Sequence, residues 1–151
     1  MVTETNELLE KICWKLSRGD VANYVVDIEI FQGERIGNED NSIRNILGAN
    51  VVEVGEVKKS DISELLKITQ EGFEFSGGES MHPNKEYLFS EEFKLEIGQA
   101  LEQIKLLFSD DSEIFSFWLK NGHPFYPVFW DYAFLVRKKQ KDFVFIGSSS
   151  D

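Results

Sequence analysis

The chain has 151 residues, 42% of them hydrophobic, with a net charge of -11 and a single cysteine, Cys13. A chain of this length buries one sizeable core, so we expect one globular domain over residues 1–151. Its apolar runs are too short for a membrane span, no signal peptide is recognisable, and one cysteine forms no internal disulfide. These features predict a cytoplasmic protein that has no membrane partner.

The negative charge is concentrated in the middle of the sequence. Residues 20–112 hold twenty acidic and eight basic side chains, whereas the two ends are close to neutral. Binding to nucleic acid normally requires clustered Lys and Arg that neutralise phosphates, so the acidic middle argues against a nucleic-acid partner. It fits a cationic protein partner, because complementary fields accelerate encounter. It also fits a charge that only keeps the protein in solution.

A helix followed by a strand is expected at the start of the chain. Apolar residues recur at helical spacing over 8–16, with Thr5 as the expected N-cap and Cys13 on the apolar face. Over 22–31 the period changes to two, which predicts a strand. The next residues, 32–42, are rich in turn formers and acids and predict an exposed loop.

The middle of the chain continues with shorter elements. We expect a short helix over 43–47 and a second strand over 51–57. Asp61 and Glu64 then have the spacing of a capping box. The apolar period that follows predicts a second main helix, which ends near Gly72.

The second half of the chain predicts a long helix and a meander of strands. Residues 74–89 show no period, and connections of this length are usually functional or disordered. The segment 90–108 begins with a serine N-cap and carries the clearest amphipathic stripe. Three strands follow, over 113–119, 128–137 and 142–147. Because helices are segregated from most strands, we predict an α+β fold: a mostly antiparallel sheet of about five strands packed against about three helices.

Aromatic residues make up nine of the twenty positions from Phe115 to Phe134. Aromatic side chains at strand spacing usually pack in the core. Nine are more than one side of a small sheet can hide, so we expect some of them to form a groove or an exposed patch. The residues selected for this binding patch are Phe125, Tyr126, Trp130 and Tyr132.

Few residues are candidates for catalysis. Asp131 lies between two aromatic residues of one predicted strand, where burial would raise the pKa of its carboxyl and allow acid–base chemistry; facing solvent, it would be an ordinary polar interruption. His123 lies in an Asn-Gly-His-Pro segment and is typical of a turn. Asp27 and Glu29 share one strand face, which permits a paired-carboxylate site, although a solvated sheet face explains them more simply.

The sequence has no motif for a metal, a cofactor or an activated nucleophile. It contains two histidines, neither of them in a His-Glu-x-x-His helix, and no Cys pair. Phosphate-binding loops, dinucleotide-binding glycine motifs and the Gly-x-Ser-x-Gly elbow are also missing from the sequence. We therefore predict no metal site and no cofactor, and a non-enzymatic role is favoured.

Three functions remain open. The leading hypothesis is a small acidic protein-binding domain, such as an immunity or antitoxin-type inhibitor of a cationic partner. It would use acids such as Glu34, Glu39 and Asp40 together with the aromatic turn, the connection over 122–127 that contains Phe125 and Tyr126. The second is a small-molecule-binding protein or enzyme with an aromatic pocket around Asp131 and His123. The third is a homodimeric structural subunit that hides its aromatic patch between two copies.

Overall fold

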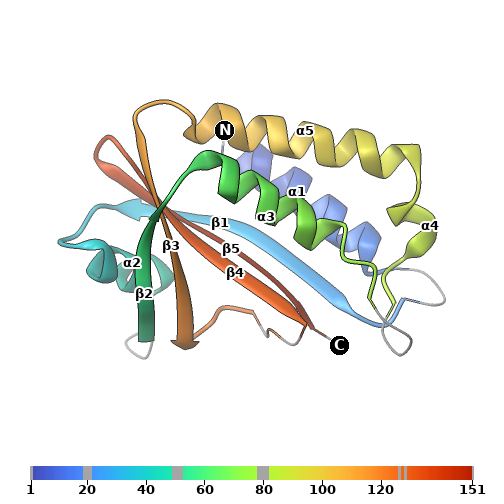
Figure 1. Ribbon diagram of the computed structural model, residues 1–151, viewed down its shortest axis with the longest axis horizontal. Helices are drawn as coiled ribbons and strands as arrows, with labels where there is room; N and C mark the ends of the chain where they lie inside the picture. The colour runs from blue at the N-terminus through green and yellow to red at the C-terminus, as the bar shows by residue number, and fades with distance from the viewer. Residues whose placement is uncertain are drawn as a thin grey trace.

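One antiparallel sheet of five strands organises the computed structural model, which describes residues 2–18, 22–48, 53–77, 82–125, 127 and 129–150 (Figure 1). The strands lie in the order β1-β5-β4-β3-β2 and are β1 (Val25–Glu34), β2 (Glu53–Ser60), β3 (Ser112–Asn121), β4 (Trp130–Lys138) and β5 (Lys141–Ser150). The helices are α1 (Val2–Leu16), α2 (Glu39–Leu47), α3 (Ile62–Phe73), α4 (Lys85–Leu88) and α5 (Glu91–Phe108). The predicted α+β fold and its C-terminal three-stranded meander are confirmed.

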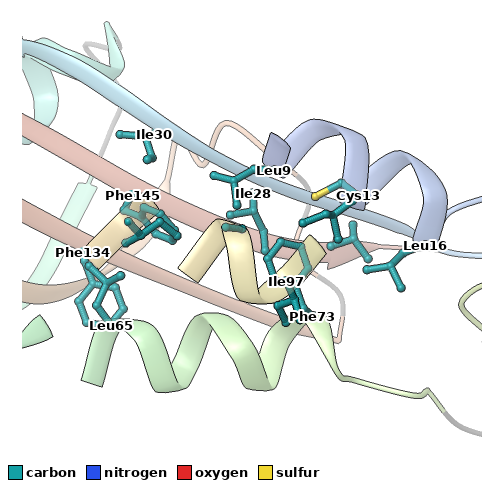
Figure 2. Close-up of a cluster of buried hydrophobic side chains, with 14 of the residues drawn as sticks. Leu9, Cys13, Leu16, Ile28, Ile30, Leu65, Phe73, Ile97, Phe134 and Phe145 are labelled. Carbon is teal, nitrogen blue, oxygen red and sulfur yellow. The ribbon is translucent and has the colours of Figure 1, made fainter. Parts of the chain in front are cut away.

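The helices are divided between the two faces of the sheet. α1 packs along β1, α3 packs against β4 and β5, and α5 contacts both of these helices (Figure 1). We call this side the helical face; Figure 2 shows side chains of its core, which come from both the helices and the sheet. α2 covers part of the opposite face, where Ile43 joins a second apolar cluster with Phe117, Leu135, Val144 and Ile146. The apolar run of β5 is thus buried on both sides, as expected of a central strand.

Two of the predicted helix starts are confirmed and one is wrong. The Asp61 side chain accepts a hydrogen bond from the amide of Glu64 at 2.8 Å, and the Ser90 hydroxyl caps α5 in the same way. α1, in contrast, begins before Thr5, which lies inside the helix and does not cap it. Thr5 is buried and donates to the side chain of Gln103 in α5 at 3.1 Å. Tertiary contact with α5 therefore overrides a local capping signal.

The acidic loop predicted over 32–42 is shorter than expected. β1 continues to Glu34 because it pairs with β5 up to the position where Glu34 lies opposite Lys141. α2 already begins at Glu39, preceded by an Asn38 side chain that caps its first turn. Most of the acids in this segment therefore belong to regular elements, not to a loop.

Side chains from α1 and from Ser17, the residue that follows α1, close the free edge of β1. The side-chain amide of Asn6 donates to the carbonyl of Ile30 at 2.9 Å and accepts from the Ile30 N–H at 2.8 Å. Further along, the hydroxyl of Ser17 accepts from the N–H of Val26 at 3.2 Å. An unpaired strand edge invites pairing with other chains, and these contacts block it. They also fix α1 beside β1, where the candidate site forms.

Candidate functional site

The sheet separates the residues that were expected to form one aromatic patch. Trp130 and Tyr132 project to the helical face, where their rings stack with centroids 6.0 Å apart. Phe125 lies on the opposite face, with its ring centroid 6.3 Å from that of Phe31 in β1. Tyr126 lies outside the described residues. The described members therefore belong to two different surfaces.

A row of polar side chains crosses the opposite face. Asp27 of β1, Ser148 of β5 and Asp131 of β4 are direct cross-strand neighbours, so they project from the same side of the sheet. Glu29 is the next residue of β1 on that face. Ser148 is fully buried, whereas the side chain of Asp131 is 43% exposed. Asp131 thus faces solvent and is not enclosed among aromatic side chains.

A cleft of about 240 Å³ opens at the edge of β1, between α1 and the β3–β4 connection. Three carboxylates dominate it, those of Glu10 from α1 and of Asp27 and Glu29 from β1, together with the ring of Phe125. We call it the acidic cleft; it is lined by Asn6, Glu10, Cys13, Asp27, Ile28, Glu29 and Phe125. Among the described residues, no basic side chain forms an ion pair with any of these three carboxylates.

The two acids that β1 contributes to the cleft, Asp27 and Glu29, are held in an environment that disfavours their charge. Burial raises the pKa of Asp27. The pKa of Glu29 is also raised, first by burial and then by repulsion from Glu10 and Asp27. Burial likewise raises the pKa of the Cys13 thiol, so this cysteine is protonated at neutral pH and is not a nucleophile. A positive charge placed in the cleft would relieve the repulsion among the carboxylates.

His123 closes the turn that carries Phe125. Its Nδ1 accepts a hydrogen bond from the Phe125 amide at 2.9 Å, which requires an unprotonated nitrogen. Its Nε2 lies 3.8 Å from a carboxylate oxygen of Asp131. The imidazole is only 10% exposed, and this burial lowers the pKa of His123 despite the neighbouring acid. His123 is therefore neutral at pH 7, with its proton on Nε2.

These groups do not form a catalytic relay. In a Ser-His-Asp relay, one imidazole nitrogen contacts the serine and the other contacts the aspartate. Here Nδ1 of His123 holds the Phe125 amide and Nε2 faces Asp131, so no nitrogen remains for Ser148. The arrangement is therefore not suited to activating Ser148 as a nucleophile.

The three acids that were predicted from the sequence to bind a cationic partner lie outside the acidic cleft. Glu34 is exposed at the far end of β1 from Asp27. Glu39 lies 4.0 Å from a guanidinium nitrogen of Arg137, and Asp40 lies 3.3 Å from the Nε of Arg44. Glu39 and Asp40 also occupy the first turn of α2, where negative charge suits the helix dipole. The structure does not bring these three acids to the aromatic turn.

A second cleft of about 240 Å³ lies between the end of α3 and the start of β4. It is the counterpart of the aromatic pocket expected around Asp131, and its lining is mostly apolar: Ile68, Glu71, Gly72, Phe75, Trp130, Asp131 and Tyr132. His123 is not among the lining residues, although its Nε2 lies 3.8 Å from the carboxylate of Asp131. It offers apolar surface with little acid–base chemistry.

Reasoning from the sequence missed Glu10 and did not join Asp27 and Glu29 to Phe125. The alternation of Asp27 and Glu29 is visible in the sequence, but it equally fits a solvated strand face. Glu10 reaches the cleft only because α1 lies along β1, and Phe125 reaches it only because the β3–β4 connection packs against the opposite face. No local sequence pattern predicts that Glu10 or Phe125 reaches the cleft.

Comparisons with known proteins give no functional lead: no family model, no curated protein and no solved structure matches this chain. Over the described ranges, no group of three or more His, Cys, Asp or Glu residues is placed to hold a metal ion. In the same part of the chain, every helix is too short or too polar to cross a bilayer. The geometry of the clefts is therefore what indicates a function.

Proposed function

We propose that this protein binds a cationic partner protein through the acidic cleft, as a small inhibitor of the immunity or antitoxin type would. The observation that carries the proposal is the set of three carboxylates, from Glu10, Asp27 and Glu29, that line one cleft without a basic partner among the described residues. The proposal places the interaction in the cytoplasm, which a single free cysteine favours.

The chemistry of the acidic cleft fits a guanidinium or ammonium group. Asp27 and Glu29 would accept charge-assisted hydrogen bonds from such a group, and the ring of Phe125 would offer it an aromatic face. Binding would also relieve the repulsion from Glu10 and Asp27, which adds to burial in raising the pKa of Glu29. A partner arginine or lysine would thus neutralise negative charges that the free protein holds close together at a cost.

The rest of the molecule would assist in attracting such a partner. The net charge of -11 creates a field that accelerates the approach of a basic protein, and the rate of association would fall as salt increases. Buried arginine side chains are frequent hot spots of protein interfaces. Long-range attraction would therefore come from the whole surface, and specificity from the acidic cleft.

Two double variants test the proposal. Asp27→Asn/Glu29→Gln removes two charges from the acidic cleft, and Glu102→Gln/Asp110→Asn removes two exposed charges from α5 and the segment after it. Each variant and the wild type is immobilised, exposed to native host lysate and eluted with a salt step for mass spectrometry. We expect the wild type and the Glu102/Asp110 control to release the same basic protein.

The cleft variant should release little or none of that basic protein. Equal recovery on the cleft variant would show that the partner uses another surface. Recovery of no cationic protein from the wild type would contradict the proposed function itself.

A small apolar molecule in the second cleft is the alternative, favoured by the rings of Trp130 and Tyr132 that line it. Such a ligand would change the fluorescence of Trp130, and replacing Trp130 by Leu would remove that response. Saturable binding of an apolar dye that Trp130→Leu leaves unchanged would argue against this cleft as the site.

A further inference from the structure

The backbone position of Phe125 depends on a side chain that titrates. The Phe125 amide donates to Nδ1 of His123 at 2.9 Å, and this nitrogen accepts only while it carries no proton. The imidazole therefore closes the turn over residues 123–125 in its neutral form alone. One proton added to Nδ1 would therefore break this hydrogen bond.

The turn over residues 123–125 determines where the ring of Phe125 lies. That ring packs against Phe31 on the opposite face, with centroids 6.3 Å apart, and lies 6.2 Å from the imidazole of His123. The same ring lines the acidic cleft beside Asp27 and Glu29. A change in the turn would therefore alter the aromatic wall of the cleft.

The second imidazole nitrogen defines the alternative state. Nε2 of His123 is buried without a hydrogen-bond partner in the described part of the chain, and at 3.8 Å the nearest carboxylate oxygen of Asp131 is too distant for one. Protonation puts a hydrogen on both nitrogens, so Nδ1 opposes the Phe125 amide while Nε2 is drawn more strongly to Asp131. The protonated ring gains from moving toward Asp131 and loses the Phe125 amide.

The charged surroundings of the imidazole are simple. Asp131 from β4 is the charged side chain that acts on it. Asp27 of β1 lies in the same cross-strand row, separated from Asp131 by the neutral Ser148 of β5. Glu10 of α1 and Glu29 of β1 lie beyond, in the acidic cleft that Phe125 lines. All of these groups are acids, and of them Asp131 is the acceptor that lies within 4 Å of the imidazole.

We propose that the His123 turn is a pH-sensitive switch of the acidic cleft: neutral His123 holds Phe125 against the cleft, and protonated His123 releases it. The effect on cation binding rests on the proposed function, whereas the movement of the turn does not. Because burial lowers the pKa of His123, the switch operates at pH values below the ordinary range of histidine. Cation binding is therefore strong at neutral pH and is lost on acidification.

Two variants separate this switch from titration of the cleft acids. In His123→Asn, the side-chain oxygen can accept from the amide two residues later, as in an Asx turn, and it does not titrate. In Asp131→Asn, the charge that attracts the protonated imidazole is removed. The first variant locks the turn closed at every pH, and the second moves the opening to lower pH.

The turn is measured by NMR without any ligand. In the wild type at neutral pH, we expect Nδ1 of His123 to be unprotonated and Nε2 to be protonated. On acidification, the Phe125 amide should shift with the same midpoint as the imidazole. In His123→Asn the Phe125 amide should stay constant over that range, and in Asp131→Asn both transitions should move together to lower pH.

Either of two results would overturn the switch. One is a Phe125 amide that does not change while the imidazole titrates. The other is a proton on Nδ1 at neutral pH. If His123→Asn does not fold, the Asp131→Asn variant still tests the switch. The midpoints of the imidazole titration and of the Phe125 amide shift should then move together to lower pH.

Acetyl-arginine amide serves as the probe for the effect on the cleft. One pH unit below the pKa of His123, the wild type should bind this probe about tenfold more weakly, because about a tenth of the molecules keep the closed turn. His123→Asn should lose affinity only as the carboxylates of the cleft are protonated.

An equal loss of affinity in the wild type and in His123→Asn would contradict the coupling between the His123 turn and probe binding. Failure of the wild type to bind the probe at neutral pH would instead reject the proposed function, and the Phe125 amide would still decide the switch.

Discussion

At the scale of single residues, the packing of Tyr132 explains why a glycine stands at position 147. The two residues are cross-strand neighbours, and the Tyr132 ring lies across the Gly147 backbone. A Cβ on Gly147 would approach two ring carbons to 2.6 Å, so the ring or the backbone would have to shift. The ring also stacks on Phe145, with centroids 5.9 Å apart, so it has little freedom to move away.

Replacing Gly147 by Ala should therefore destabilise the fold by about 1–3 kcal/mol, the usual cost of overpacking a core. Gly98→Ala is the matched control, because a Cβ at Gly98 in α5 meets nothing within 4 Å. That variant should gain roughly 0.5–1 kcal/mol from better helix propensity. Urea unfolding compares the two, and similar effects of both changes would show that the Tyr132 ring adapts freely.

A buried carboxylate, Glu96, joins α1 to α5. It is 4% exposed and lies 2.6 Å from the amine of Lys11, 2.9 Å from that of Lys15 and 2.8 Å from the hydroxyl of Tyr87. Burial alone would raise the pKa of Glu96, but these three hydrogen bonds outweigh it and the pKa is lowered. A lowered pKa means that the native state favours the charged carboxylate more than the unfolded state does.

The contribution of Glu96 to stability is therefore present above its ordinary pKa of 4.5 and is lost as the pH falls through the lower native value. Glu96→Gln should cost about 1–3 kcal/mol at pH 7 and remove this part of the acid dependence. Glu92→Gln, which alters an exposed partner of the same Lys15, should change little. Denaturation curves at pH 7 and pH 3 measure this, and an unchanged acid dependence in Glu96→Gln would contradict it.

At the scale of the elements, the contact of α1 with β1 builds the acidic cleft. Asn6 satisfies both backbone groups of Ile30, and Ser17 satisfies the amide of Val26. With α1 fixed in this way, Glu10 lines the same cleft as the carboxylates of β1. The polar residues of α1 that face the strand edge thus have a structural role that their amphipathic pattern alone does not reveal.

Asn6→Ala should leave the backbone of Ile30 without its partners and cost about 1–3 kcal/mol. The sharper readout is hydrogen exchange, because the Ile30 amide should exchange faster while the Val26 amide, held by Ser17, keeps its protection. Equal acceleration at both amides would mean that α1 opens as a unit. No acceleration at Ile30 would contradict the role of Asn6.

At the scale of the whole molecule, the fold class was predictable and the acidic cleft was not. Helical and strand periods are local, so they gave the main elements and the antiparallel meander. The cleft needs α1, β1 and the β3–β4 connection to meet, and these contacts join positions far apart in the sequence. The strand alternation of Trp130, Asp131 and Tyr132 already implies that the acid and the rings face opposite ways. The side of the sheet taken by Phe125 depends on how the connection folds.

The cleft acids carry an energetic cost for the whole molecule. Burial raises the pKa of Asp27 and of Glu29, so the native state holds their charges less well than the unfolded chain does. Stability is therefore lost as the pH rises through these raised values, and the penalty is absent at lower pH. Because both side chains are half-buried, solvent screening keeps the penalty small.

The Asp27→Asn/Glu29→Gln variant should thus be more stable than the wild type at pH 7, by roughly a few tenths of a kcal/mol. This advantage should vanish at pH 3, where the wild-type acids are protonated. Glu102→Gln/Asp110→Asn, with the same net charge, should show no comparable gain. Loss of stability at pH 7 in the cleft variant would indicate that these acids support the fold.

The most direct measurement is an NMR titration of the wild type with acetyl-arginine amide, with acetyl-citrulline amide as its neutral counterpart. The proposed function predicts saturable shifts at the amides of Asp27, Glu29 and Phe125 with the arginine probe, and none with the citrulline probe. Equal shifts with both probes, or shifts scattered over the acidic surface without a preference for the cleft, would contradict it.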